Sequence, residues 1–382
     1  MTVDFDAELL IPTGDVGDFA VVACDQFAAD AGYWNKLAAE MPRFSALDLI
    51  LPECFLNESE ARIAAIKHSA ALMPADRFAR HNGAVYVTRT TKYGRTRHGI
   101  VATVDLSDYE YKPGNHALIR ASERTIESRI PPRVKIREAI DIELPHIMLL
   151  VDDRAGALMR AAASAKKSVV YDGMLRGGGG SIKGELIADT TELKKAADEI
   201  TASSLDKFGE RLFALVGDGN HSLATAKYCA EHHSTPYNNR ALVEIVDIYD
   251  EGLVFEPIHR LVSVDDKDKF VSELKKAVSG PAETSVFVPD EVKLAVPEDK
   301  IEAIVLIDRF CEEYVAQNGG YVEYVHGADA LKAEGAVGIM MRGIEKSELF
   351  GYVVNKGVLP KKTFSLGEAE EKRYYVEARK IK

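Results

Sequence analysis

Apolar and polar residues follow two different periods along this chain, and the two periods alternate almost throughout. Short apolar runs typical of buried strands lie at residues 18–23, 47–51, 146–151, 168–171, 181–187, 211–216, 240–248 and 253–262. Apolar residues spaced three and four apart, typical of amphipathic helices, lie at residues 33–40, 58–72, 154–165, 191–207 and 220–231. Asn57 stands where it can cap the second of these helices. The alternation predicts an α/β fold with a mixed sheet.

Two hairpins are predicted within this pattern. Residues 84–91 and 98–106 read as two strands joined by a turn at residues 92–95. The glycine-rich run at residues 176–184 invites comparison with a nucleotide-binding P-loop, but Ile182 stands where that motif needs a glycine directly before its lysine. Because strands flank the glycines, we expect a flexible hairpin there in preference to a lid.

The pattern changes after residue 262. Lysine-, aspartate- and glutamate-rich helices at residues 265–278 and 298–317 alternate with short strands from there on. We therefore expect three parts in this 382-residue chain: a main α/β body over residues 1–262, a smaller α/β subdomain over 263–345, and a C-terminal segment over 346–382 that returns to the main body.

Composition and charge narrow the classes of partner. The 48 basic and 60 acidic side chains give a formal net charge of −12, which argues against a nucleic-acid partner. No apolar run reaches about 18 residues, and the first residues are acidic, so we expect no membrane association and a cytoplasmic location. The four cysteines are widely spaced, which argues against disulfides or a zinc site. A small-molecule substrate fits this profile, and the sequence allows a homodimer.

One segment joins a buried strand to a helix through two glycines. The apolar run at residues 211–216 breaks at Gly217-Asp218-Gly219, and helical spacing resumes at Asn220. Glycines allow a tight turn, and the first amides of a helix have no intrahelical acceptor. The turn therefore predicts an anion pocket, although a Gly-Asp-Gly-Asn segment by itself is more often a plain turn that starts a helix.

Several polar side chains of this segment suit such a pocket. Asp218 ends the strand, where α/β sheets place ligand-binding groups, and His221 can contact a phosphate or carry a proton. Asn220 or Ser222 can cap the helix or contact the anion, and Thr225 follows as a further phosphate ligand.

The same segment resembles the D-G-H-H-R motif of the ParB/sulfiredoxin-like superfamily, in which a strand, a D-G-x-H turn and a helix bind nucleotide phosphates. Asp218, Gly219 and His221 match the motif position by position, whereas Asn220 and Ser222 replace its first histidine and its arginine. Archaeal ADP-dependent free L-serine kinases carry a similar motif after an apolar strand. The resemblance implies a ParB/sulfiredoxin-like core with nucleotide phosphates bound at the turn.

A widespread prokaryotic family of unknown function, often labelled ParB-like, is similar to this chain over a longer span. Four further landmarks carry the resemblance: ACDQF at residues 23–27, SERT at 122–125, PIHRL at 257–261 and PKKTF at 360–364. Together they cover most of the chain, whereas the likeness to the serine kinases is local.

Without the motif arginine, the expected phosphate site needs another source of positive charge. Arg124 and Arg133 belong to one basic cluster, and if the residues after Pro132 are helical, Arg133 shares a face with Arg137. Lys361 and Lys362 form a second cluster on an expected loop. Each of these charges by itself can simply be solvated, but their density in an acidic protein favours anion binding by at least one cluster.

The catalytic base is expected to be Asp218 itself or one of three other carboxylates. Asp25 and Glu53 each follow an apolar run, and Glu123 lies in the central landmark. The serine kinases use a glutamate near their N-terminus, which does not align with one position here, so all three stay open.

These observations, with the resemblance, predict a kinase: a phosphotransferase that acts on a small hydroxylated metabolite. Free L-serine, converted to O-phosphoserine, is the first acceptor expected, with ATP, ADP or pyrophosphate as donor and Mg²⁺ assisting. The alternatives are a ParB-like nucleotide-binding module without metabolite turnover and a phosphatase acting on phosphoserine-type esters.

Overall fold

The computed structural model describes residues 2–24, 26–27 and 30–382. The chain divides into two compact units. The main unit comprises Met1–Leu253 and Ala369–Lys382, and the inserted unit comprises Val254–Glu368. The boundaries near 263 and 345 that the sequence suggests fall within the inserted unit, and a subdomain with those limits stays a prediction.

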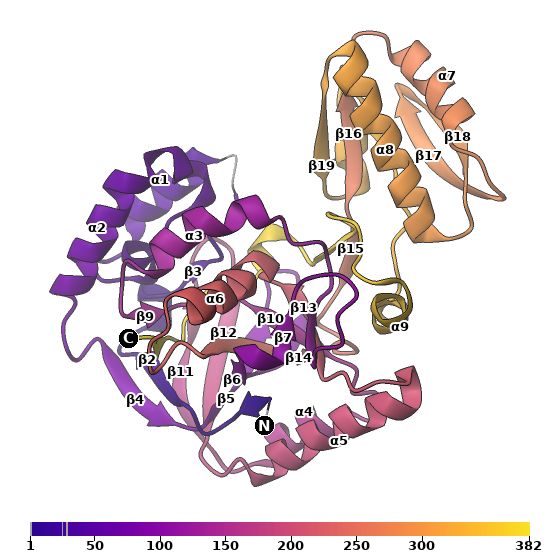
Figure 1. Cartoon of the computed structure of the whole chain (residues 1–382). Helices are drawn as coiled ribbons and strands as arrows, with labels where there is room; N and C mark the ends of the chain where they lie inside the picture. The colour runs from indigo at the N-terminus through magenta and orange to yellow at the C-terminus, as the bar shows by residue number, and fades with distance from the viewer. Residues whose placement is uncertain (1, 25, 28–29) are drawn as a thin grey trace. The chain divides into compact units, whose positions relative to one another are not determined.

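A mixed sheet lies at the centre of the main unit (Figure 1). Over the described residues it has ten strands, in the order β11-β12-β5-β6-β14-β10-β13-β8-β7, with β1 added beside β6. The α/β class expected from the sequence is confirmed. The strands are β1 (Val3–Asp4), β5 (Ala84–Thr90), β6 (Thr96–Asp105), β7 (Tyr109–Glu110), β8 (Ile119–Ala121), β10 (Met148–Val151), β11 (Lys167–Leu175), β12 (Gly180–Ile187), β13 (Ala214–Asp218) and β14 (Arg240–Asp247).

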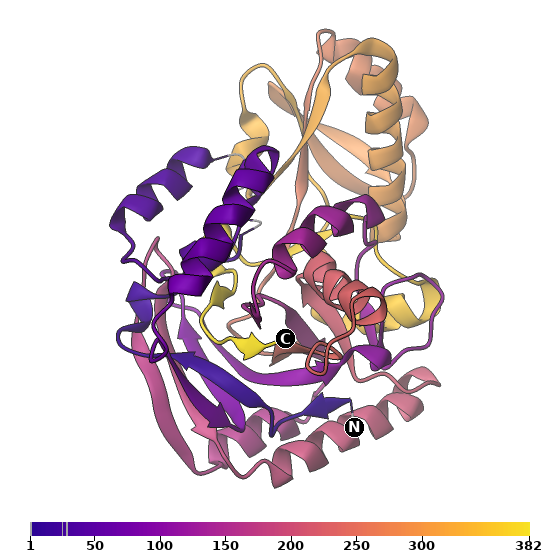
Figure 2. The same ribbon diagram turned by 60° about the vertical axis from the view of Figure 1, so that its left-hand side comes forward.

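Helices cover the two faces of this sheet because alternate strand residues point to opposite sides. Val85 and Val101 face a core that α1 and α2 help to close, whereas Ile100 and Val243 face a core closed by α4 and α5 (Figure 2). The helices α3 and α6 pack against each other. The helices are α1 (Ala31–Glu40), α2 (Ser59–Leu72), α3 (Ile130–Arg137), α4 (Ala157–Ser164), α5 (Thr191–Phe208) and α6 (Asn220–His232).

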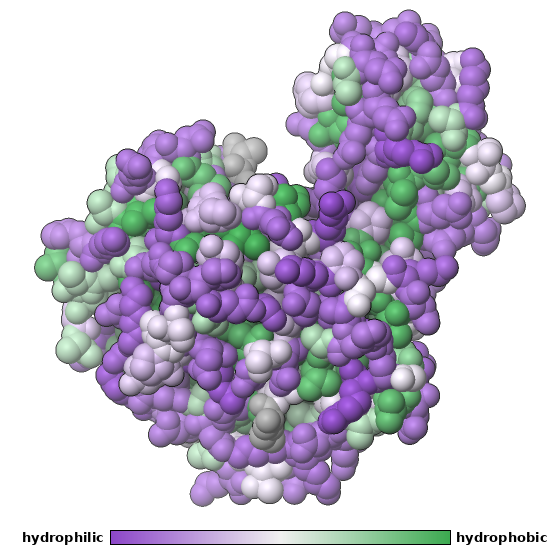
Figure 3. All heavy atoms as spheres, viewed as in Figure 1, coloured by the Kyte–Doolittle hydropathy of each residue, from purple (hydrophilic) through white to green (hydrophobic). Residues whose placement is uncertain are grey.

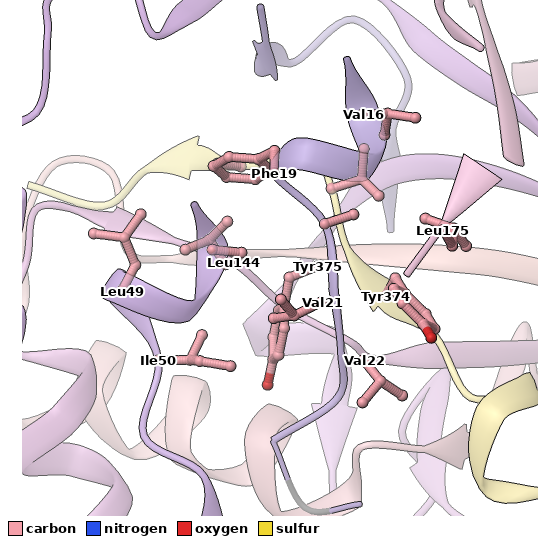
Figure 4. Packing of buried hydrophobic residues seen from close by; sticks show 14 of the residues in the cluster. Val16, Phe19, Val21, Val22, Leu49, Ile50, Leu144, Leu175, Tyr374 and Tyr375 are labelled. Atoms are coloured by element: carbon pink, nitrogen blue, oxygen red, sulfur yellow. The ribbon is translucent and has the colours of Figure 1, made fainter. Parts of the chain in front are cut away.

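Short paired strands tie the two ends of the chain to the main unit. Tyr374 and Tyr375 of β22 lie beside Val21 and Val22 of β3 in the first core (Figure 4). The C-terminal segment from Ala369 thus closes a core that the N-terminal residues begin. The pairs are β2 (Glu8–Pro12) with β4 (Phe78–Asn82), β3 (Val21–Val22) with β22 (Tyr374–Tyr375), and β9 (Ile142–Glu143) with β23 (Arg379–Lys380).

Both expected hairpins are confirmed. β5 pairs with β6 in an antiparallel register, and β11 pairs with β12 around the glycine-rich turn. Gly180 has a positive φ of +80°, and a Cβ there would lie 2.1 Å from the carbonyl oxygen of Thr90. The glycine-rich run is therefore required by strand packing.

Two local expectations were wrong. The run at residues 47–51 does not form a strand: η2 (Ala46–Leu49) is a 3-10 helix that begins with a capping box between Ser45 and Asp48. Asn57 does not cap α2, because it lies inside the 3-10 helix η3 (Glu53–Glu58), which runs directly into α2. In both places local hydrogen bonding of the turns outweighs the apolar pattern.

The inserted unit has its own sheet, in the order β18-β17-β20-β16-β19, with α7 and α8 packed together and a separate strand pair β15-β21. Because β15 and β21 pair, the chain enters and leaves this unit on adjacent strands. The elements are β15 (Phe255–Pro257), β16 (His259–Ser263), α7 (Lys267–Ala277), β17 (Ala282–Val288), β18 (Asp290–Val296), α8 (Lys300–Asn318), β19 (Tyr321–Val325), β20 (Val337–Ile339), α9 (Lys346–Lys356) and β21 (Phe364–Leu366).

The face of the chain seen in Figure 3 is mainly hydrophilic, with apolar side chains in small groups. Across the described residues, none of the helices combines the length and the apolar character that a membrane span requires.

Candidate functional site

The turn between β13 and α6 has the geometry that its sequence suggests. Gly219 has a φ of +82°, and a Cβ on it would lie 2.9 Å from the Cα of Ile147. Its amide donates to Asp218 Oδ1 at 2.9 Å, and the first helical bond runs from the amide of Leu223 to the carbonyl of Gly219 at 3.0 Å. The three amides between them precede that first bond, so they are directed at the space beyond the helix end.

The cap of α6 differs from the expected one. Gly219 is the N-cap residue, so neither Asn220 nor Ser222 caps the helix through its side chain. The Asn220 Oδ1 is instead buried without a hydrogen-bond partner among the described residues. Thr225 is occupied locally, since its Oγ1 donates to the carbonyl of His221 at 2.7 Å. Gly217 lies within β13, one residue before Asp218.

A lysine that the sequence pattern did not single out lies at this turn. Lys372, from the C-terminal segment of the main unit, is buried with its Nζ 3.3 Å from Asp218 Oδ2. It provides a fixed positive charge beside the turn, although it lies more than 150 positions away in the chain. The adjacent Lys372-Arg373 pair was its one signal in the sequence.

The other expected basic cluster belongs to the inserted unit. Lys361 and Lys362 belong to the inserted unit, where Lys361 Nζ lies 2.9 Å from Glu312 Oε1. Their role as phosphate ligands stays a prediction.

The loop after β8 is brought beside the turn. β8 runs parallel to β13, so Glu123 and Arg124 follow the same edge of the sheet as Asp218. The amide of Ile126 donates to His221 Nε2 at 3.2 Å, which joins this loop to α6. Two segments almost 100 residues apart, both singled out from the sequence, therefore lie together.

A cavity of about 130 Å³ opens beside α6 within the main unit. Arg133 and Arg137 of α3 both line it, so the face that these arginines were expected to share is confirmed. Ser222 and Thr225 line it from α6. The remaining lining residues are Cys24, Leu49, Ile50, Leu51, Ile136, Ile140, Ile142, Glu143, Leu144, Pro145, His146, Ile147 and Tyr375.

Both cavity arginines are paired with carboxylates. Arg133 forms an ion pair with Glu53, so two residues expected to act separately at the site hold each other. Arg137 pairs with Glu143, which also accepts from Arg379 at 3.1 Å. Burial alone would raise the pKa of Glu143, but the charges of Arg137 and Arg379 and the amide of Leu242 outweigh it and lower that pKa.

A chain of hydrogen bonds joins three other residues that line the cavity. The Tyr375 hydroxyl lies 2.9 Å from His146 Nδ1 and 3.0 Å from Cys24 Sγ. In Figure 4 this hydroxyl points away from Phe19 and the packed side chains around it. Cys24 belongs to the ACDQF landmark at residues 23–27, whereas His146 and Tyr375 lie outside the landmarks, and sequence reasoning selected none of the three as site residues.

The remaining candidates are placed as follows. Asp25 lies outside the described residues. Over the described part of the chain, His, Cys, Asp and Glu side chains form no cluster of three or more that could hold a metal ion.

The fold and the turn define a mixed α/β protein in which a glycine turn joins β13 of the main sheet to the N-terminus of α6. By sequence, the chain belongs to the family described as protein of unknown function (DUF1015), whose model matches residues 7–363. No curated protein matches the chain.

Several solved structures are similar at low identity. A free serine kinase in complex with AMP is 11% identical, with a TM-score of 0.41, over 74% of this chain and 91% of that one. A conserved hypothetical protein from Pyrococcus furiosus is 11% identical, with a TM-score of 0.39, over 74% of this chain and 95% of that one. SbnI from Staphylococcus aureus, with a C-terminal truncation, is 12% identical, with a TM-score of 0.37, over 72% of this chain and 82% of that one. Scores this low do not establish a shared fold.

Proposed function

We propose that this chain is a phosphotransferase that moves a phosphoryl group from a nucleotide or pyrophosphate to the hydroxyl of a small metabolite. The observation that carries the proposal is the turn from β13 into α6, where the N-terminus of the helix directly follows Asp218 and the buried Lys372 pairs with that aspartate. Amides at a helix terminus bind phosphate oxygens, and a fixed lysine adds the charge that the absent motif arginine would have supplied. A ParB/sulfiredoxin-like phosphate site is the reading that fits this arrangement.

Different residues around the turn would have different roles in a transfer reaction. The amides of residues 220–222 and Lys372 would hold the donor phosphates, while Asp218 fixes the position of the lysine. Glu123, which follows β8 at the same sheet edge, would accept the proton of the acceptor hydroxyl, whereas Glu53 is paired with Arg133. Asp25 stays a candidate for the same proton. Catalysis would come from positioning and charge neutralisation, with Mg²⁺ neutralising the donor phosphates when bound.

Free L-serine is the acceptor that the motif resemblance favours, so it is the first to test. The protein is incubated with L-serine and, in turn, ATP, ADP or pyrophosphate, each with Mg²⁺, and O-phosphoserine is measured by mass spectrometry. A panel of other small alcohols is run in parallel. We expect a phosphorylated product that falls at least about a hundredfold in Lys372→Met, since the variant lacks the charge beside the donor. Lys195→Gln, an exposed lysine on α5, is the matched control.

Three other outcomes contradict the proposal in distinguishable ways. Nucleotide binding without any phosphorylated product would favour a binding module. Release of phosphate from O-phosphoserine without donor consumption would favour a phosphatase. No binding of any donor, with Lys372→Met indistinguishable from the wild type, would remove the turn from consideration as a phosphate site.

A further inference from the structure

The wall of the cavity beside α6 includes one arginine, Arg137, that shares its carboxylate with an arginine outside the cavity lining. Arg133 is matched by Glu53, but Arg137 and Arg379 share the single carboxylate of Glu143. Two guanidinium groups against one carboxylate leave a net charge of +1 at this corner, because arginine stays protonated in proteins. A buried surplus charge is costly unless a counter-charge accompanies it.

Arg137 also has donor capacity left over. Its Nε is buried and donates no hydrogen bond to any described residue, although its Nη2 lies against Glu143. The guanidinium is planar and its donors form a fixed fork that matches the two oxygens of a carboxylate. Arg137 is therefore suited to hold a carboxylate that the protein itself does not supply.

The size and the walls of the cavity limit what that carboxylate can belong to. An apolar cavity of about 150 Å³ holds a molecule of the size of benzene, and this cavity is close to that volume. The volume suits a molecule of about that size. Leu51, Ile136 and Ile140 are among the lining residues, so aliphatic groups are available to contact the carbon skeleton of a ligand.

A ligand with an ammonium group is disfavoured here. Among the described lining residues, Glu143 is the one carboxylate, and it already accepts from Arg379 and from the amide of Leu242 at 2.9 Å. An α-ammonium group in the cavity would thus lose its hydration without gaining a carboxylate of its own.

We propose that this cavity binds the acceptor of the transfer reaction, and that the acceptor is a small aliphatic hydroxy acid. The inference rests on the proposed function. The carboxylate lies on Arg137, the carbon chain lies along the aliphatic wall, and the hydroxyl points to Ser222, which the cavity shares with the phosphate turn. The hydroxyl oxygen forms a bond to the terminal phosphorus as the bridging P–O bond of the donor breaks. The hydroxyl proton passes to the carboxylate at the sheet edge, and the donor leaves one phosphate shorter.

Three compounds with one carbon skeleton test this acceptor class by calorimetry without any donor. They are 3-hydroxybutanoate, butane-1,3-diol, which lacks the carboxylate, and L-threonine, which adds an ammonium group. We expect 3-hydroxybutanoate to bind at least about tenfold more tightly than the other two, since it alone pairs with Arg137 at no cost in ammonium hydration. Arg137→Gln removes this preference, and Arg62→Gln, which alters an arginine on α2 outside the cavity, leaves it intact.

The remaining outcomes separate this inference from the proposed function. Equal binding of the acid and the diol, or an acid preference that survives Arg137→Gln, overturns the acceptor class. Ile136→Phe fills the cavity without changing its charge, so acid binding that persists in this variant also overturns it. Phosphorylation of L-serine at an unchanged rate in Arg137→Gln would support the phosphotransferase function but contradict acceptor binding in the cavity. Binding of the acid through Arg137 without phosphorylation by any donor would support the ligand class and contradict the proposed transfer reaction. Thermal melting of each variant shows that it is folded.

Discussion

Asp247 ends β14 close to Asp153, which follows the parallel strand β10. Burial raises the pKa of Asp247 to about 6, and the nearby charge of Asp153 adds to this rise. The amide of Tyr249, which donates to Asp247 Oδ1 at 3.1 Å, opposes it. The two acids lie at the carboxyl ends of the neighbouring parallel strands β14 and β10. A carboxyl group in this position destabilises the fold once it ionises.

We therefore predict a pH-dependent gain in stability for Asp247→Asn. The folded pKa of about 6 lies above the ordinary value of 3.8, so the wild type has the full stability of the protonated form below about pH 4 and loses it as the pH rises through 6. The amide side chain keeps the acceptor for Tyr249 and cannot ionise.

The variant should exceed the wild type at pH 7.5 by on the order of 2 kcal/mol in the free energy of unfolding and match it below about pH 4. Denaturant unfolding across this pH range measures the difference. Glu199→Gln, an exposed acid on α5, should show none of it. A constant difference at every pH would mean that Asp247 acts through packing and not through its charge.

At the scale of elements, the site is built at the junction of β13 and α6. β13 lies between β8 and β10, so the loop after β8 and the residues before β10 both reach the turn. Gly219 is held against Ile147, and the close approach leaves no room for a Cβ. The strand order thus places the helix amides, and the contact with Ile147 fixes the angle at which α6 leaves the sheet.

Gly219→Ala should disturb this junction by more than its backbone strain. A left-handed φ costs a non-glycine residue about 1 kcal/mol, and the contact with Ile147 adds to that cost. Gly209→Ala is the matched control, because Gly209 has a φ of +76° with open space around it. We expect the melting temperature and the affinity for inorganic pyrophosphate to fall further in Gly219→Ala than in Gly209→Ala. Equal losses would show that the contact with Ile147 is unimportant.

At the scale of the whole molecule, the main unit is completed by the last residues of the chain. Arg373 is buried and donates to Glu244 Oε2 at 2.9 Å and to Glu377 Oε2 at 2.7 Å, while Arg97 holds the other oxygen of Glu244. The charges of Arg97 and Arg373 lower the pKa of Glu244 although burial opposes it. Residues before and after the inserted unit therefore share one buried charge network and one core.

Truncation after Glu368 should accordingly unfold the main unit and spare the inserted one. Glu244 loses Arg373, and a buried ion pair broken on one side costs about 3–5 kcal/mol, in addition to the apolar surface that β22 covered. Calorimetry of the truncated chain should show that the transition of the main unit is lost. Lys380→Gln, which alters an exposed lysine in the same segment, should melt as the wild type does. A truncated chain with an unchanged transition would contradict this account of the C-terminal segment.

Local signals determined much of the fold and part of the site. The period of the apolar residues predicted the hairpins and the strand that ends at Asp218, because side-chain burial follows backbone geometry directly. The glycines around Asp218 predicted the turn, since few other residues adopt its backbone conformation. At η2 and before α2, short-range hydrogen bonds form 3-10 helices, and there the predicted strand at residues 47–51 and the predicted Asn57 cap were wrong.

The tertiary structure alone decided which distant charges meet. Lys372 reaches Asp218 only because the chain returns to the main sheet after the inserted unit, and the periodicity of a sequence carries no record of such a return. The pairings of Arg133 with Glu53 and of Arg137 with Glu143 likewise join α3 to η3 and to β9. The sequence by itself therefore determined the turn and its amides, whereas the three-dimensional packing decided which side chains surround them, since contacts between residues far apart in the chain are set by the shape of the whole core.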